Sequence, residues 1–302
     1  MKIRSILALT DLSVDADRAV RRAARLAADH GAELRLLCLS SDARGRTGDP
    51  LPRLQRRARR LARQHGFTVD VVAGVAESVD DVARHRERAD LIVLRDGRRS
   101  LPWPLRWRRL TERLADRTGL PVLAVGPSSP LPYARVTVGL DLRSRSAVLL
   151  EHACRFRVGA RIEALHVLGT LRALGVRFLM SAPHVRSARL REARRQALRA
   201  LQRLAADANA RDGRVVPAIG FGAVASGILA RQSEVQASLT VVGAGRRAWL
   251  ASLPFGSVAR NLLDAATGDV LLVPEPVERG RRPAPAHAGL AARVAGVAAD
   301  AG

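Results

Sequence analysis

ILALTDLSVDADRAVRRAARLAADHGAELRLLCL, at residues 6–39, returns in altered form as VTVGLDLRSRSAVLLEHACRFRVGARIEALHVL at residues 136–168. Each copy has a short apolar run that ends in an aspartate, Asp11 or Asp141. A helix-length stretch, a Gly-Ala turn and a second apolar run follow in both copies. Such an internal repeat is decisive for the fold because it marks a duplicated structural unit.

Two further pairs of segments continue the repeat. ADLIVLRDGRR (89–99) matches ASLTVVGAGRR (237–247), and TGLPVLAVGP (118–127) matches TGDVLLVPEP (267–276). The order of the matching segments is the same in both halves of the chain, and their spacing is nearly constant. The sequence therefore predicts two tandem domains of the same fold.

Short apolar runs alternate with amphipathic stretches throughout each half. Runs such as LIVL and VLLV lack polar alternation, which is typical of strands covered on both faces. We expect strands at 3–10, 34–40, 67–73, 91–95, 121–126, 134–140, 162–168, 214–219, 238–242 and 269–273. Helices are expected near 15–30, 51–65, 77–88, 105–117, 144–158, 186–211, 223–234 and 256–266. This alternation predicts an α/β fold, with two flavodoxin-like or Rossmann-like domains, each a five-stranded parallel sheet with helices on both faces.

Proline and serine mark the expected domain boundary. The segment SSPLP (128–132) favours a linker, which gives domains at 1–128 and 133–276. Residues 277–302 are rich in Ala, Gly, Pro and Arg, a composition typical of a disordered tail. We therefore expect two folded units and an unstructured C-terminal segment.

The formal charge of +23 raises the question of a nucleic-acid partner. All but one of the 51 basic residues are arginines, Lys2 being the exception, and aromatic residues are only 3% of the chain. This usage also fits a GC-rich coding sequence whose arginines lie on solvated helix faces. The basic run at 53–63 fits either a nucleic-acid-binding surface or the solvated face of an amphipathic helix, and we favour the solvated face. We expect no nucleic-acid partner beyond non-specific binding.

The remaining composition points to a cytoplasmic protein without a membrane partner. No segment approaches the roughly 18 consecutive apolar residues of a transmembrane helix. The N-terminal sequence lacks the features of a signal peptide. Cys38 and Cys154 lack the spacing of a metal or redox site, so we expect both to be packing residues and no metal site.

The segment VVGAGRRAWLASLPFGSVAR (241–260) has the features of a phosphate-binding loop. Gly243 and Gly245 leave the backbone accessible to a ligand after a buried strand. Gly256 and Ser257 open a helix, where free backbone N–H groups and a hydroxyl favour an anion. The loop has no Walker-type lysine, which argues against efficient phosphoryl transfer.

With these features the chain resembles the universal stress protein family, over about residues 1–275. ATP-binding members have a G-x-x-G-(nine residues)-G-[ST] loop, and Gly243, Gly256 and Ser257 fall on its first and last elements. Arg246 stands at the second glycine, with Gly245 displaced by one position. The resemblance implies that the chain binds ATP as a cofactor, with or without Mg²⁺. The residues it implies for this site are Leu140, Asp141, Val167, Val242, Gly243, Gly245, Arg246, Gly256, Ser257 and Val258.

The first half departs from the family pattern. Arg95 stands in the place of Gly243, and Trp107-Arg108 stand opposite Gly256-Ser257. A tryptophan at the helix start prevents backbone amides from closing around a phosphate. We therefore expect the first domain to have lost the nucleotide site, with Asp11 retained as a turn residue.

The resemblance implies a stress-response regulatory or binding module with no catalytic residues, not an enzyme. Two alternatives remain open at this stage. One is a stress scaffold that does not bind nucleotide, and the other is a basic nucleic-acid-binding protein. The resemblance further implies that the fifth strands of the two domains pair in an intramolecular pseudo-dimer, to which a homodimer could be added.

Overall fold

The structure is a computed structural model. It describes residues 2–40, 49–95, 110–127, 132–142, 145–156, 161–169, 183–209, 214–244 and 258–274. The expected tail at 277–302 and the loop at 245–257 lie outside these residues.

Each half contributes five strands and the helices between them. The first half comprises β1 (Ser5–Thr10), α1 (Ala16–His30), β2 (Glu33–Leu39), α2 (Leu51–His65), β3 (Val69–Ala76), α3 (Val79–Ala83), η1 (Arg86–Arg88), β4 (Leu91–Arg95), α4 (Leu110–Thr118) and β5 (Val122–Val125). The second comprises β6 (Arg135–Gly139), α5 (Ser146–Arg155), β7 (Arg161–Leu168), α7 (Pro183–Asn209), β8 (Val215–Phe221), α8 (Val224–Glu234), β9 (Leu239–Ala244), α9 (Val258–Ala265) and β10 (Asp269–Pro274).

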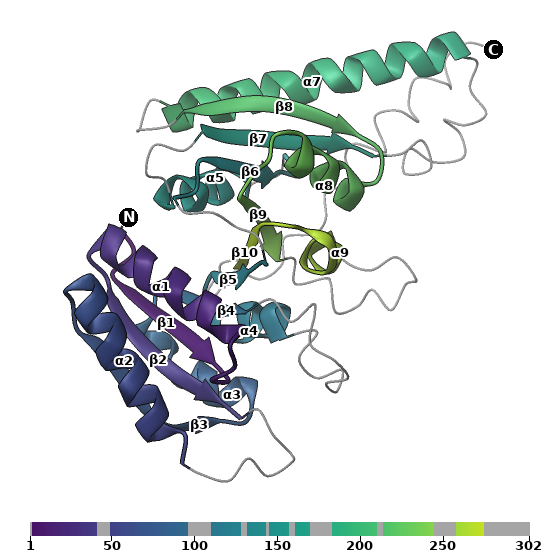
Figure 1. Cartoon of the computed structure of the whole chain (residues 1–302). Coiled ribbons are helices and arrows are strands. Elements are labelled where there is room, and N and C mark those ends of the chain that lie inside the picture. Colours follow the sequence, from purple (N-terminus) through teal and green to yellow (C-terminus); the bar gives the residue numbers. More distant parts are fainter. Residues whose placement is uncertain are drawn as a thin grey trace.

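The ten strands of the described residues form one sheet, in the order β3-β2-β1-β4-β5-β10-β9-β6-β7-β8 (Figure 1). Within each half every pairing is parallel. The two halves meet where β5 pairs with β10 in the antiparallel direction, with Leu123 opposite Leu271. The expected doubly wound α/β fold and the pairing of the two fifth strands are therefore confirmed.

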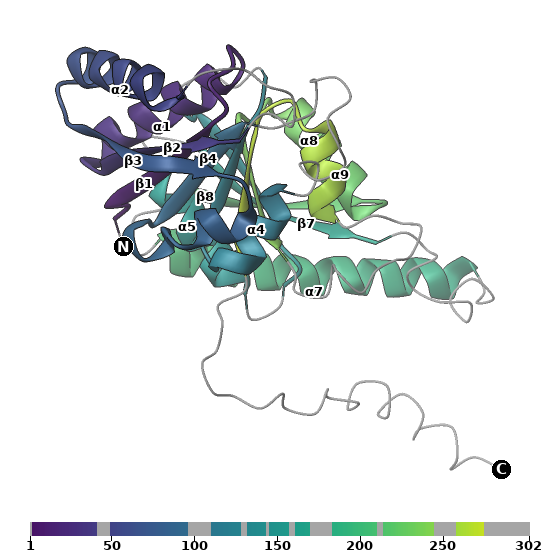
Figure 2. The same cartoon turned by 90° about the horizontal axis from the view of Figure 1, so that it is seen from below.

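Helices cover both faces of the sheet, and each face has one core that runs through both halves. One core includes buried residues of α1, α2, α5 and α7, and the other includes buried residues of α3, α4, α8 and α9. Figures 1 and 2 show α1 and α2 on the opposite side of the sheet from α8 and α9. The apolar strands are thus buried on both faces, as their unbroken hydrophobic runs predict.

Equivalent positions are buried in the first helix of each half. Ala19, Val20 and Ala23 of α1 are buried, as are the residues 130 positions later in α5, Leu149, Leu150 and Ala153. The repeat in sequence is therefore a repeat in packing, and equivalent positions can be compared directly.

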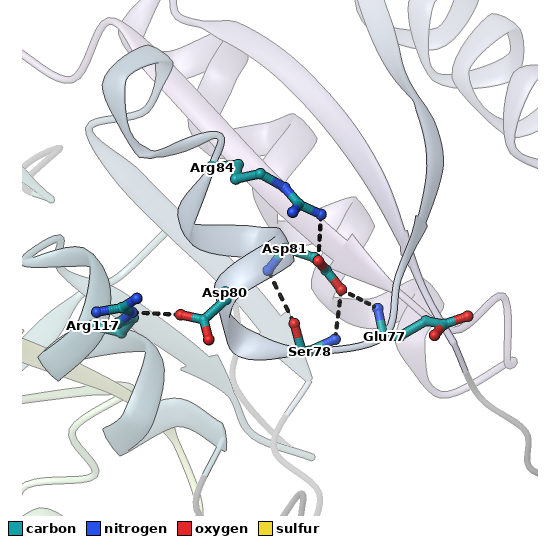
Figure 3. Close-up of polar contacts among 6 residues, drawn as sticks. All are labelled: Glu77, Ser78, Asp80, Asp81, Arg84 and Arg117. Carbon is teal, nitrogen blue, oxygen red and sulfur yellow. Dashed lines mark hydrogen bonds and ion pairs between the residues drawn. The ribbon is translucent and has the colours of Figure 1, made fainter.

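The helix expected at 77–88 is instead broken, which corrects the sequence prediction. α3 begins with a capping box, in which Ser78 Oγ accepts from the Asp81 N–H and the Asp81 carboxylate accepts from the Ser78 N–H (Figure 3). The backbone N–H of His85 donates to Val82 O at 3.0 Å, an i→i−3 bond that tightens the chain. The short 3₁₀ turn η1 follows because α-helical hydrogen bonding does not continue.

Buried charges join the two halves beside the β5–β10 contact. Asp269, with 0% exposure, forms an ion pair with Arg22 of α1 at 2.8 Å. Its carboxylate also accepts from the Tyr133 hydroxyl at 2.5 Å and from the Gly126 N–H at 3.0 Å. The Arg22 guanidinium lies 4.8 Å from the centre of the Tyr133 ring. Burial and the negative charge of Asp269 raise the pKa of Tyr133 well above its usual value. One cluster thus joins residues of both domains.

Candidate functional site

The carboxyl ends of β6 and β9 form a topological switch point in the second half. β6 and β9 are adjacent, but the helices that follow them, α5 and α9, belong to opposite faces of the sheet. Chain segments that leave neighbouring strands in opposite directions open a crevice, which is where doubly wound proteins bind ligands. Asp141 follows β6 and is exposed, whereas Gly243 lies near the end of β9.

The turn after β6 has an unusual backbone conformation that the first half repeats. Leu142 has a φ of 59° and Leu12 has a φ of 60°, both in the left-handed region. A leucine in that region costs roughly 1–2 kcal/mol because its Cβ crowds the backbone. Both copies keep the same turn after the aspartate, so the turn is a shared feature of the duplicated unit.

Leu140 and Val167 frame the β7 side of this edge. The Leu140 N–H donates to Leu165 O at 2.8 Å, and the Leu140 carbonyl accepts from His166 Nδ1 at 2.8 Å. Because a carbonyl can only accept, His166 Nδ1 holds the proton. The Val167 side chain is buried against α8, where a Cβ on Gly227 would approach its Cγ1 to 2.8 Å. Only backbone atoms of Val167 are therefore available to a ligand.

The side chain of Val242 is likewise buried in the core. It is 4% exposed and lies close to Gly139, where an added Cβ would approach Val242 Cγ1 to 3.2 Å. The strand places Val242 and Gly243 beside the segment that leads from β6 to Asp141. The structure thus brings Leu140, Asp141, Val167, Val242 and Gly243 to one edge of the sheet.

Arg145 occupies space at this edge that the sequence prediction did not assign to it. A Cβ built on Gly243 would lie 2.3 Å from Arg145 Nη2, so the guanidinium lies in the space that a side chain at this position would take. Arg145 Nη2 also donates to Ala244 O at 3.4 Å. Arg145 follows Asp141 by four residues at the start of α5, a spacing that could have drawn attention to it. A positive charge therefore lies over the glycine expected to face a ligand.

The phosphate side of the predicted site is described only in part. Gly245, Arg246, Gly256 and Ser257 lie outside the described residues. Val258 is the first residue of α9 and is 36% exposed. Helix α9 packs against β9 and β10, so its N-terminal turn lies on the same half of the sheet as Gly243.

An ion pair spans the equivalent switch point of the first half. Arg95 at the end of β4 contacts Asp15 at the start of α1, with Nη2 2.9 Å from Oδ2. Asp11 is half-buried, and its Oδ1 accepts from the Ser13 N–H at 2.9 Å. This hydrogen bond confirms that Asp11 has a role in the turn.

Among the described residues, no group of three or more His, Cys, Asp or Glu side chains is arranged to hold a metal ion. No helix in that part of the chain is both long and apolar enough to cross a lipid bilayer.

The fold and this edge define a tandem doubly wound α/β protein with a candidate ligand site at one of its two switch points. Comparison with protein families matches the chain twice to "Universal stress protein family", at residues 2–126 and 132–274. The chain belongs to the universal stress protein family.

Solved structures with the same fold include two that span almost the whole chain. A universal stress protein from Archaeoglobus fulgidus DSM 4304 is 15% identical with a TM-score of 0.65, covering 91% of this chain and 97% of its own. A functionally unknown protein from Pseudomonas aeruginosa PAO1 is 20% identical with a TM-score of 0.64, covering 91% and 93% respectively. Comparison with curated proteins gave no match.

Proposed function

We propose that this protein is a stress-response regulatory module that binds ATP in its second domain and acts in the cytoplasm, not as a metabolic enzyme. The observation that favours this is the difference between the two switch points. The second presents an exposed Asp141 and a Gly243 without a Cβ, whereas Arg95 and Asp15 bind each other at the first.

The residues at the second switch point suit different parts of a nucleotide. Asp141 offers a carboxylate for the adenosine side, and the backbone of Val167 and Val242 and the second lone pair of the Leu140 carbonyl would lie beside it. Gly243 and Gly245 leave the backbone accessible, while Gly256, Ser257 and Val258 would supply helix-start donors to phosphate. Arg145 and Arg246 add guanidinium groups, which pair with phosphate through two parallel hydrogen bonds. ATP bound here would act by its occupancy, altering the conformation or the partners of the protein.

Calorimetric titration of the full chain with ATP tests the proposal. Asp141→Ala should weaken ATP binding by at least about tenfold, since a charge-assisted hydrogen bond is lost. Asp11→Ala is the matched control, because it removes the equivalent aspartate of the first half, and it should leave ATP affinity unchanged. Equal affinity in wild type and Asp141→Ala would refute the assignment.

A second function, a stress scaffold that binds no nucleotide, is favoured by the place of Arg145. Its guanidinium lies in the space that Gly243 leaves open. If Arg145 binds phosphate, Arg145→Ala lowers ATP affinity; if it fills the site, the same change raises it. Mass spectrometry of the untreated purified protein adds an independent result, because co-purified adenine nucleotide would exclude the scaffold.

A nucleic-acid-binding role is the third candidate, and the charge of +23 is the observation behind it. It predicts retention of DNA or RNA that persists at moderate salt and falls steeply with increasing ionic strength. Non-specific attraction predicts weak retention that is lost at moderate salt.

A further inference from the structure

An open cavity lies in the first half between the turn after β1 and helix α2. Its volume is about 340 Å³, and it is lined by Leu12 and by four arginines of α2, Arg53, Arg56, Arg57 and Arg60. The arginines follow an i, i+3, i+4, i+7 pattern, which places them along one side of the helix. We call these four arginines and Leu12 the arginine groove.

Within helix α2 itself, the clustering of arginines is unfavourable. Its 15 residues include six arginines and no acidic residue. Like charges three and four positions apart repel each other and destabilise a helix. The buried residues Leu54, Ala58 and Leu61 hold the helix on the sheet, so the exposed Arg53, Arg56 and Arg60 are not needed for packing.

Arg57 fixes the inner end of the groove. It forms an ion pair with Asp17 of α1, and its Nη1 donates to Thr10 Oγ1 at 3.3 Å. Its side chain is only 17% exposed, and burial, together with nearby Arg60, lowers its pKa. The other three arginines are exposed, and among the described residues no hydrogen bond or ion pair is found for their side chains.

The neighbouring acids each have a partner. Asp15 binds Arg95, Asp17 binds Arg57, and Asp11 accepts from the Ser13 N–H in its own turn. The positive charge of Arg53, Arg56 and Arg60 is therefore directed to the cavity without a matching protein carboxylate. A ligand with several closely spaced negative charges would complete the groove.

We propose that the arginine groove of the first domain binds the clustered phosphates of a small oligophosphate. Guanidinium groups pair with phosphate through two parallel hydrogen bonds. The compact cavity fits a short anion better than an extended nucleic-acid backbone, which a linear basic surface would follow. The groove lies on helix α2 and belongs to the half whose switch point is closed by Arg95 and Asp15, so it does not depend on ATP binding by the second domain.

Titration calorimetry of the full chain with inorganic tripolyphosphate tests the proposal. The double variant Arg56→Gln with Arg60→Gln should weaken binding by at least about tenfold, because two charged donors are lost. Arg59→Gln with Arg63→Gln is the matched control. It removes the same charge from exposed positions of the same helix outside the cavity, and it should change affinity less than about threefold.

Further titrations distinguish a nucleotide ligand from free oligophosphate and from nucleic acid. If the phosphates are those of a nucleotide, ATP should show a groove-dependent binding event that AMP lacks; if they are free oligophosphate, only tripolyphosphate should. Equal weakening in the two double variants, or no tripolyphosphate binding by the wild type, would overturn the proposal. So would groove-dependent binding of a single-stranded oligonucleotide without binding of tripolyphosphate. Circular dichroism should show unchanged helix content in both double variants, since all four arginines are exposed.

Discussion

The two switch points of the molecule use an arginine to span the same gap from opposite sides. In the first half Arg95 extends from the end of β4 to Asp15 at the start of α1. In the second half Gly243 stands in the place of Arg95, and Arg145, in the place of Asp15, extends from α5 over that glycine. The first arrangement pairs the guanidinium with the Asp15 carboxylate, whereas the second places it within hydrogen-bonding reach of the Ala244 carbonyl. One duplicated fold thus supplies this gap with an arginine from the strand end in one copy and from the helix start in the other.

The largest effect is expected where the two halves join. Asp269→Ala would leave Arg22, which is 5% exposed, without its carboxylate, along with the Tyr133 hydroxyl and the Gly126 N–H. Breaking a buried ion pair in this way costs about 3–5 kcal/mol. Urea unfolding followed by circular dichroism should show this loss, and a loss below about 1 kcal/mol would mean that the cluster does not hold the halves together.

The equivalent helix position in the second half predicts a pH effect. His152 of α5 stands 130 residues after Arg22, and burial, together with nearby Arg155, lowers its pKa from 6.5 to about 4. Between these values the unfolded chain binds more protons than the folded one. The contribution of His152 to the free energy of unfolding is therefore fully present above pH 6.5. It falls by up to about 3 kcal/mol as the pH falls toward 4. His152→Gln should flatten this part of the pH profile in urea unfolding, and an unchanged profile would contradict the assignment.

Exchanging the two switch-point arrangements tests the comparison itself. Gly243→Arg with Arg145→Asp recreates the Arg95–Asp15 pair in the second half. ATP affinity measured by calorimetry should fall by about a hundredfold, or about 2.7 kcal/mol, because the new pair closes the site. Arg95→Gly, the change at the matching first-half position, should leave ATP affinity unaltered. An exchanged protein that still binds ATP normally would show that the switch point is not the site.

The smallest effect on stability is expected at the helices that follow the third strand of each half. α3 has the Ser78 capping box, whereas α8, with Ala223 at its N-cap, has no side-chain cap. Ser78→Ala should destabilise the protein by about 1 kcal/mol, and Ala223→Ser, at an extended N-cap, should stabilise it by a similar amount. Thermal unfolding of the two variants should shift in opposite directions, and shifts of the same sign would contradict this.

Local patterns were sufficient to predict most of the fold. Buried strands such as LIVL and VLLV are recognisable because both faces are apolar, and the repeat of Asp11 and Asp141 fixed the order of elements. The break after Ala83 was missed because it depends on i→i−3 hydrogen bonding that residue types alone do not indicate.

The candidate site was only partly predictable for a similar reason. Asp141 and Gly243 follow buried strands, so their place at the sheet edge could be inferred. The position of Arg145 over Gly243, 98 residues away, follows from tertiary packing and the absence of a Cβ. The arginine groove was interpreted as a solvated face because sequence periodicity does not show that Leu12 closes one side of it.

Photo-cross-linking with 8-azido-ATP, followed by peptide mass spectrometry of the full chain, tests most directly whether only the second half binds nucleotide at its switch point. We predict adenine-dependent labelling of peptides within 136–168 or 237–265, competed by excess ATP and absent in Asp141→Ala. Labelling of peptides within 6–39 at equal yield, or labelling that Asp141→Ala does not reduce, would contradict the account.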